Sequence, residues 1–458
     1  MKSITQNNRQ MKSINDKFLD FSQQYQLGNI LRAANARKRT GFPALQIFLL
    51  VISTVFQHGS LYMQMHLHPE SFSFGKDTVY RFMNSCHINW RHFTTLLASR
   101  IISQTIVPLT SDARKNVFII DDSLFSRSRS KKVELLAKVF DHAHHVYTYG
   151  FRMLTLGWSD GNTFLPVNYC LLSSENAKNR IHEASNLIDP RTNGGRQRKL
   201  AQQKATAVVL QLLDEAIAAG ITAKHVLFDT WFCSPSMLVA VKQKGLDIVT
   251  MTKKSPKMRY RYHGEMQSVM SIYKQCKKRR GRSKYLLSVE AEVAKDGDAI
   301  PVRLVYVRNR NKRSQYLVLV STDMSLSEEE IIQMYGKRWN IEVFFKICKS
   351  YLRLSRDCRS LSYDAMTAHV AVVFTRYAIL AVEQRTNEDM RSLGELFFIT
   401  IDELPDLPYL EAVHLLMTQF ANAICQHCLL EEKVVQELLD IFMKKLPSIW
   451  IEDLRCCA

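Results

Sequence analysis

Two short apolar runs, each followed directly by aspartate, constrain the fold of this chain more than any other feature. Residues 116–120 (Asn-Val-Phe-Ile-Ile) precede Asp121 and Asp122, and residues 224–228 (Lys-His-Val-Leu-Phe) precede Asp229. Runs of this length and composition are typical of strands that are buried on both faces. Because helical patterns alternate with such strands, the sequence predicts an α/β fold in which acids stand at the strand ends.

Further strands and helices are expected around these two runs. Asp160-Gly161-Asn162 is a hairpin signal, and Gly220 is a suitable residue just beyond the C-terminus of a helix. The expected elements are strands over 149–158 and 163–172, a helix over 199–219, a short helix, and a strand over 247–250.

The first 110 residues show apolar residues at three- to four-residue spacing, which indicates helices. The segment 74–82 fits either a DNA-recognition helix or an ordinary amphipathic helix. Pro43 suits the first position of a helix. The expected helices span 18–33, 43–57, 76–83 and 90–103.

Positive charge is concentrated in one stretch. The chain of 458 residues has a net charge of +19, and residues 253–285 hold twelve Lys or Arg against a single acid, Glu265. Such an excess favours a polyanionic partner, either nucleic acid or an anionic membrane surface. The basic run lies among predicted strands and not on an amphipathic helix, so nucleic acid is the expected partner. We expect no membrane span, because the best candidate, 43–56, falls short of the ~20 apolar residues required.

Pattern and charge together divide the chain into five regions. We expect a helical DNA-binding domain over 1–110 and the first part of the α/β core over 111–250. A β-rich basic insertion over 251–325 precedes the second part of the core, 326–385. The helical region 386–458 has a net charge of −8 and a possible role in dimerisation. Ten scattered cysteines show no disulfide framework, which favours a reducing, cytosolic setting.

Three acids in this arrangement suggest a metal site. Asp121 and Asp229 follow strands, and Glu342 lies on a helix that Ser327 and Glu330 open as a capping box and that runs to about residue 351. Converging carboxylates would hold two Mg²⁺ or Mn²⁺ ions, which prefer oxygen ligands. The same helical face carries three or four further groups suited to phosphate, namely Tyr335, Arg338, Lys346 and Lys349. An exposed face with an Arg338–Glu342 pair is the alternative interpretation.

The run from Tyr335 to Lys349 has the spacing Tyr-x2-Arg-x3-Glu-x6-Lys. It resembles the Tyr-Arg-Glu-Lys motif of DDE transposases from bacterial insertion sequences, in the cut-and-paste branch that this spacing defines. Residues 120–123 (Ile-Asp-Asp-Ser) and 228–232 (Phe-Asp-Thr-Trp-Phe) resemble the two aspartate motifs of the same family. The resemblance covers residues from about 110 to 385.

The resemblance implies an RNase H-like mixed sheet with flanking helices, interrupted by a β-rich insertion before the glutamate. It implies that Asp121, Asp229 and Glu342 are catalytic and ligate two Mg²⁺ (or Mn²⁺) ions, and that Tyr335, Arg338 and Lys349 hold phosphates near the transposon end. It also implies end cleavage through a DNA hairpin, joining of 3′ ends to target DNA, and a homodimer that bridges two ends. The expected phosphate contacts of the basic insertion are Lys277, Lys278, Arg279, Arg280 and Arg282.

Several interpretations stay open at this point. Only one of Asp121 and Asp122 can face the site, and the motif register favours Asp121. Relatives stack a flipped base on a tryptophan of the insertion, whereas this insertion has only tyrosines. We assign Trp231 and Trp339 to core packing. The histidines of 141–145 suit a polar loop at DNA or solvent better than a metal site, and a zinc site at 425–428 is disfavoured. The tyrosines available in the insertion are Tyr260, Tyr262, Tyr273, Tyr285, Tyr306 and Tyr316.

Three functions remain in competition. The leading hypothesis is a DNA transposase in the bacterial cytoplasm. A metal-dependent nuclease of the same fold would need the same acids but would join no ends. A non-catalytic DNA-binding descendant would be expected to lose one of the acids, and the sequence has all three.

Overall fold

The computed structural model describes most of the chain up to residue 386. The described residues are 14–38, 40–56, 65, 74–111, 114–141, 144–280, 283–295, 297–309, 315–354, 357–386 and 434. The region 386–458, for which dimerisation was expected, therefore lies almost entirely outside the described residues. So do Cys425, His427 and Cys428.

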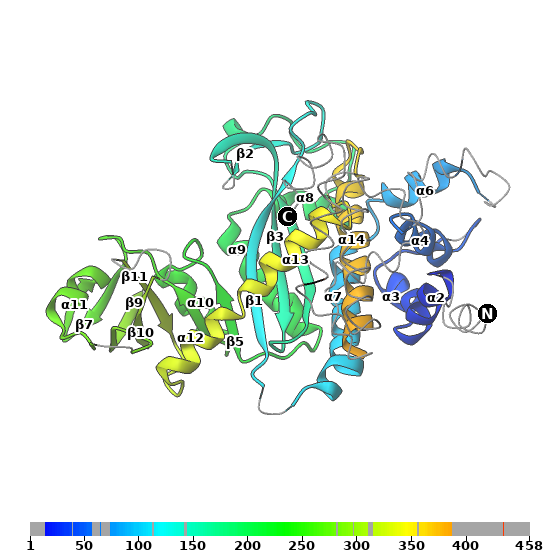
Figure 1. Ribbon diagram of the computed structural model, residues 1–458. Coiled ribbons are helices and arrows are strands. Elements are labelled where there is room, and N and C mark those ends of the chain that lie inside the picture. The colour runs from blue at the N-terminus through cyan, green and yellow to red at the C-terminus, as the bar shows by residue number, and fades with distance from the viewer. Residues whose placement is uncertain are drawn as a thin grey trace.

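One mixed sheet of eleven strands runs through the described part of the chain (Figure 1). Its centre is β1 (Val117–Ser126), which pairs antiparallel with β3 (Val146–Ser159) and parallel with β5 (His225–Phe228). β4 (Phe164–Leu172) pairs antiparallel with β3, and β6 (Asp247–Met251) lies parallel to β5. The order β4-β3-β1-β5-β6, with three antiparallel and then two parallel strands, confirms the expected RNase H-like α/β fold.

The β-rich stretch before the glutamate helix extends this same sheet. β11 (Tyr316–Ser321) pairs with β6, and β10 (Asp298–Arg308) and β9 (Leu287–Lys295) follow outward. β7 (Arg259–Tyr262) and β8 (Glu265–Ser268) complete the far end, beside the short helix α11 (Val269–Gln275). Figure 1 shows these strands at one end of the molecule, away from the N-terminal helices.

Neighbouring residues of β4 show how helices cover both faces of the core sheet. Asn168 donates from Nδ2 to Glu215 of α9 (Ala205–Ala218) at 2.7 Å, whereas the next residue, Tyr169, donates to the Thr367 carbonyl of α14 (Tyr363–Thr386) at 2.6 Å. Side chains alternate across a strand, so α9 and α14 lie on opposite faces. Helix α13 (Trp339–Ser350) packs on the α14 face through Phe344, whose ring lies 5.1 Å from that of Phe164.

The N-terminal helices pack beside α14 (Figure 1). Rings of Phe48, Trp90 and Phe93 form their aromatic centre. Arg376 of α14 is buried and donates to the carbonyls of Val51 and Ile52 at the end of α4, at 2.7 and 3.0 Å. The helices are α2 (Ile14–Gln24), α3 (Leu27–Ala33), α4 (Ala44–Ser53), α6 (Lys76–Met83) and α7 (Trp90–Ile101), which continues through a π-helical turn (Ile102–Ile106) and a 3₁₀ turn (Val107–Leu109).

Three expected elements differ in their extent. The helix expected over 18–33 breaks at Gln26, which takes a left-handed conformation with φ 49°. The helix expected over 199–219 is two helices, α8 (Asn193–Ala201) and α9. The strand expected to end before Asp121 instead continues through both aspartates to Ser126, because β3 pairs with it along its whole length. Asp121 therefore lies within a strand and not at its end.

Several other expectations agree closely with the structure. The hairpin between β3 and β4 turns at Gly161, whose φ of +94° favours glycine. Strands β5 and β6 and helix α6 lie within a residue of their expected bounds, and the predicted short helix is α10 (Pro235–Gln243). The capping box of Ser327 and Glu330 opens α12 (Glu328–Gly336). Pro43 stands just before α4 and not at its first turn.

The expectation that no helix has the length and apolarity of a membrane span is wrong for α14. This helix of 24 residues passes that test by length and composition, but 94% of its most apolar window is buried inside the protein. A helix that is enclosed by protein needs apolar residues around its whole circumference. The position of α14 between the sheet and the N-terminal helices accounts for its apolar composition.

A buried ionic network holds α8 and α14 together. Arg198 of α8 contacts Glu134 at 2.6 Å and Asp364 of α14 at 2.7 Å, and its side chain is only 5% exposed. Gly194 permits this approach, since a Cβ there would lie 2.3 Å from the Asp364 carboxylate. Removal of one partner would leave buried charges without compensation.

We expect Arg198→Met to lower the free energy of unfolding by about 3–5 kcal/mol, the range typical of a broken buried ion pair. Urea denaturation followed by circular dichroism measures this change. The control is Arg191→Met, since Arg191 is 89% exposed and forms a surface ion pair with Asp189. Equal midpoints for the two variants would contradict a structural role of the Arg198 network.

Candidate active site

Two of the three predicted acids are neighbours because their strands are parallel partners. Ile119 of β1 pairs with Leu227 of β5, so Asp121 and Asp229 both lie about two residues beyond this pair. Asp121 lies on β1 where its pairing with β5 ends, and Asp229 directly follows β5. The backbone N–H of Trp231 donates to Oδ1 of Asp229 at 2.8 Å and orients that carboxylate.

Arg338 connects Asp121 to the third acid. Its Nη1 lies 2.9 Å from Oδ2 of Asp121, and its Nη2 donates to Oε1 of Glu342 one turn along α13. The guanidinium is 17% exposed, and Asp121 and Glu342 are 15% and 33% exposed. Arg338 thus links Asp121 and Glu342, and the charge of Asp229 acts on Asp121. The oxygens of the three acids do not all lie within 4.8 Å of one another, so a cation held by all three would have to draw them closer together.

The site carries more negative than positive charge. Burial raises the pKa of Asp121 to about 7, because the pull of Arg338 only partly offsets desolvation and the repulsion from Asp229. Burial also raises the pKa of Asp229, against the hydrogen bond from Trp231 and the attraction of Arg338. The three carboxylates supply hard oxygen ligands, and one guanidinium does not balance their charge. A bound cation would therefore stabilise their ionised forms.

Asp122 has a different ion-pair partner from these acids, although its charge acts to raise the pKa of Asp229. Successive residues of β1 point to opposite faces, and the Asp122 carboxylate pairs with Nε of Arg152 on β3 at 2.5 Å. Arg152 was not found by sequence reasoning. Only the pairing register of β1 with β3, in which Leu124 pairs with Arg152, would have placed Arg152 near Asp122. That register cannot be derived from the sequence of either strand alone.

The expected single helix over 327–351 is broken, which changes the arrangement of the motif. Lys337 and Arg338 separate α12 from α13, so Tyr335 and Glu342 stand on different helices. The Tyr335 ring still lies 5.9 Å from the Arg338 guanidinium, and burial raises the pKa of the Tyr335 hydroxyl to about 12.

The two lysines of the motif helix lie further along α13. Lys346 is exposed, whereas Lys349 is half-buried. Burial lowers the pKa of Lys349, while Asp141 at the end of β2 (Ala137–Asp141) acts to raise it. At 1.5 Å rise per residue, Lys346 and Lys349 lie about 6 and 10 Å beyond Glu342. The motif therefore forms a row that runs from the acids toward β2.

The assignment of two tryptophans to core packing is wrong. Trp231 is 52% exposed and Trp339 is 62% exposed, although both stand beside the predicted acids. The Trp231 ring has Arg152 at 5.1 Å and Lys253 at 4.9 Å from its centre. An exposed indole flanked by two cations next to Asp229 belongs to the surface of the site, and Trp231 followed the predicted acid in the sequence by only two residues.

The basic run of the insertion is not part of the acid group. Lys277, Lys278, Arg279 and Arg280 follow α11, and the Arg279 N–H donates to the Leu286 carbonyl just before β9. With strands ~4.8 Å apart, β9 lies roughly 19 Å from β5 across the sheet. Arg282 lies outside the described residues.

Some cations of the insertion lie against tyrosine rings. Tyr273 and Tyr316 stack with ring centres 4.1 Å apart, and Lys278 and Lys254 lie 4.7 Å from them respectively. Arg279 lies 4.2 Å from the Tyr285 ring. Of the tyrosines considered for stacking, Tyr260, Tyr285 and Tyr306 are buried, which leaves Tyr262, Tyr273 and Tyr316 partly exposed.

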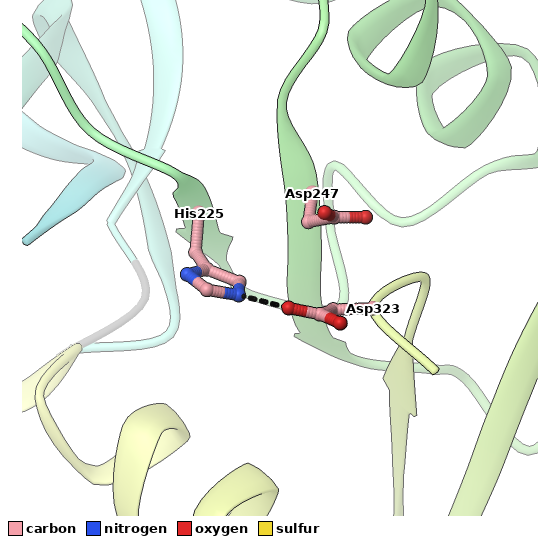
Figure 2. A group of neighbouring side chains, drawn as sticks. All are labelled: His225, Asp247 and Asp323. Atoms are coloured by element: carbon pink, nitrogen blue, oxygen red, sulfur yellow. Dashed lines mark hydrogen bonds and ion pairs between the residues drawn. The ribbon is translucent and has the colours of Figure 1, made fainter. Parts of the chain in front are cut away.

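A second group that could hold a metal ion lies at the opposite ends of β5 and β6. His225, Asp247 and Asp323 place ligand atoms within 4.8 Å of one another, and all three are buried (Figure 2). Nε2 of His225 lies 2.8 Å from Oδ2 of Asp323. His225 and Asp247 begin their strands, whereas Asp229 follows the end of β5, so the two groups stand at different edges of the sheet.

Lysines compensate the acids of this second group. Lys224 lies 2.9 Å from Asp323, and Lys242 pairs with Asp247. Burial acts to raise the pKa of Asp323, but hydrogen bonds from Ser325, Lys224 and His225 outweigh it and hold the pKa well below its usual range. A cation would have to displace these partners, which makes the group a weaker metal candidate than the acids around Arg338.

The raised pKa of Asp121 predicts how a variant behaves. Above pH 7 the folded protein holds a charged Asp121 that the unfolded chain would solvate better, and only near pH 4 and below do both states have it protonated. We expect Asp121→Asn to raise the free energy of unfolding by ~2 kcal/mol at pH 8 without metal, and the gain to shrink as the pH falls below 7 and to vanish near pH 4.

Urea denaturation at both pH values in the presence of a chelator tests this expectation. Asp214→Asn is the control, because Asp214 is 58% exposed and lies on α9. A loss of stability for Asp121→Asn at pH 8 would show that the Arg338 contact outweighs the cost of burial.

Comparison with known proteins agrees with the fold. No curated protein matches the chain. Residues 42–310 match the sequence model of the DDE superfamily endonuclease family, a span that includes β1, β5 and most of the strands beyond them. Because this match covers more than half of the 458 residues, the chain belongs to the DDE superfamily endonuclease family.

Proposed function

We propose that this protein is a cut-and-paste DNA transposase of a bacterial insertion sequence. Family membership implies a divalent-metal-dependent endonuclease that acts on DNA. The observation that carries the finer proposal is the arrangement around Arg338, which contacts Asp121 and Glu342 beside Asp229. In this proposal the protein cleaves the ends of its element through a hairpin and joins the 3′ ends to target DNA.

Asp121, Asp229 and Glu342 are the proposed metal ligands. Their oxygens suit Mg²⁺ or Mn²⁺, and the raised pKa values of both aspartates mark a site where additional positive charge is favourable. Two such ions activate a water or a 3′-hydroxyl and stabilise the leaving oxygen in phosphodiester cleavage. Asp121 is preferred to Asp122, because Arg338 joins Asp121 to Glu342 whereas Asp122 is paired with Arg152.

Arg338 and its neighbours are the proposed phosphate ligands. The guanidinium can exchange a carboxylate for a phosphate oxygen with the same planar geometry. Tyr335 lies beside it, and Lys346 and Lys349 extend the row of donors along α13. These groups would orient the scissile phosphate against the acids and fix the direction of the DNA strand.

The insertion supplies the proposed backbone contacts at a distance from the acids. Lys277, Lys278, Arg279 and Arg280 stand at one end of the sheet, and Arg282 follows them in the sequence. Phosphate contacts of this kind position the duplex without reading its bases. A homodimer that bridges two ends, in the bacterial cytoplasm and without a membrane partner, completes the proposal.

A supercoiled plasmid that carries the DNA flanking this gene tests the proposal. Purified protein with Mg²⁺ or Mn²⁺ should break the plasmid at both element ends and produce joined products. We expect Glu342→Gln to reduce cleavage by at least ~100-fold, the upper range for the loss of a residue that only supports a metal ligand. Glu183→Gln is the matched control, since Glu183 is 60% exposed and pairs with Arg180.

The DNA products of this reaction distinguish the competing functions. Cleavage that depends on Glu342 without joined products would leave a plain metal-dependent nuclease. Binding without cleavage in either metal would contradict an enzymatic function and leave a DNA-binding descendant of a transposase.

The location of the metal can be tested without activity. We expect Mn²⁺ binding, followed by isothermal titration calorimetry, to be lost in Asp229→Asn and unchanged in His225→Ala. Since ligation requires a deprotonated Asp121, the affinity of the wild type should fall as the pH drops through about 7. Loss of binding in His225→Ala alone would show that the metal binds to the group of His225, Asp247 and Asp323.

A further inference from the structure

The hairpin of β2 and β3 exposes aromatic side chains on one face. Lys138 pairs with Tyr149 across the two strands, and Phe140 pairs with Tyr147. Tyr147 is 66% exposed, Tyr149 is 40% exposed and Phe140 is 36% exposed. The intervening residue Val139 is 6% exposed, so the opposite face packs against the protein. We call Lys138, Phe140, Tyr147 and Tyr149 the hairpin face.

Exposed aromatic clusters of this kind mark interaction sites. Phe140 and Tyr147 form an edge-to-face pair with centres 5.2 Å apart, and Nζ of Lys138 lies 4.9 Å from the Tyr147 ring. The loop before β2 adds the exposed cations Arg129, Lys131 and Lys132. Aromatic surface interleaved with positive charge is the combination that binds single-stranded nucleic acid, by stacking on bases and by contacts to phosphates.

The hairpin face lies beyond the acids, in the direction in which α13 runs from Glu342 toward Lys349. Asp121 pairs with Thr155 of β3, and Tyr149 and Tyr147 follow six and eight residues away on that strand. At ~3.4 Å per residue this corresponds to roughly 20–27 Å from Asp121. Lys349, near the end of α13, interacts with Asp141 at the end of β2. Figure 1 shows β2 at the end of the core sheet beyond the C-terminal half of α13.

We propose that the hairpin face binds unpaired bases of the DNA strand that leaves the active site. The occupant is single-stranded DNA, because a paired duplex shows only base edges in its grooves whereas tyrosine and phenylalanine rings stack on base faces. The face lies roughly 20–27 Å from Asp121 along β3, so it would meet bases several nucleotides from the phosphate at the acids. The inference rests on the proposed function, which supplies the strand.

Binding of labelled (dT)20 and of a 20-base-pair dA·dT duplex, followed by fluorescence anisotropy, tests the inference. The full chain carries Glu342→Gln throughout, so that no probe is cut. We expect Tyr147→Ala with Tyr149→Ala to weaken (dT)20 binding by about 10-fold or more and duplex binding by less than about 3-fold. Tyr147→Phe with Tyr149→Phe should restore (dT)20 binding, because the rings remain.

Ile217→Ala on α9 is the control for the loss of an exposed apolar side chain, since Ile217 is 41% exposed. Unchanged (dT)20 binding in the alanine pair would overturn the inference, as would equal losses for both probes. A change of oligomeric state with unchanged DNA binding, measured by light scattering, would also overturn it and assign the face to a second copy of this chain. Failure of the proposed function shows separately, as wild-type protein that does not cut the flanking plasmid.

Discussion

The contact of Arg338 with Asp121 and Glu342 joins the two halves of the site. Asp121 belongs to the central strand of the sheet and Glu342 to a helix that follows more than 200 residues later. Carboxylates brought this close repel one another, and a single guanidinium between two of them reduces that repulsion. The strand fixes one acid, the packing of Phe344 against Phe164 fixes the helix, and Arg338 sets the distance between them. Without this cation the sheet and α13 would present their charges to each other unshielded.

Much of this arrangement could be derived from the sequence, because its causes are local. Apolar runs before Asp121 and Asp229 gave two adjacent strands, and the motif spacing identified Glu342. What escaped prediction depends on contacts between distant segments. The extension of β1 to Ser126 comes from pairing with β3, and the exposure of Trp231 comes from the shape of the surface around Asp229. Aromatic residues are predicted as core by default, so an exposed tryptophan at a site is the error to expect.

The chain contains two groups of buried or partly buried acids, and charge compensation distinguishes them. Asp323 and Asp247 each have a lysine, and the pKa of Asp323 is depressed accordingly. Asp121 and Asp229 share one arginine and have raised pKa values. A compensated network stabilises the ends of β5, β6 and β11, whereas the raised pKa values of Asp121 and Asp229 mark acids whose charges are less well compensated. The proposed metal ligands and the compensated network thus lie toward opposite ends of the parallel strands.

The pairing of β6 with β11 has a mechanical consequence. A separate module on a flexible tether could swing relative to the acids, but Leu319 and Met251 are paired residues of adjacent strands in one continuous sheet. The cations beyond β9 therefore keep a nearly constant separation from Asp229, and in the proposed function this separation would set the distance between the backbone contacts and the acids.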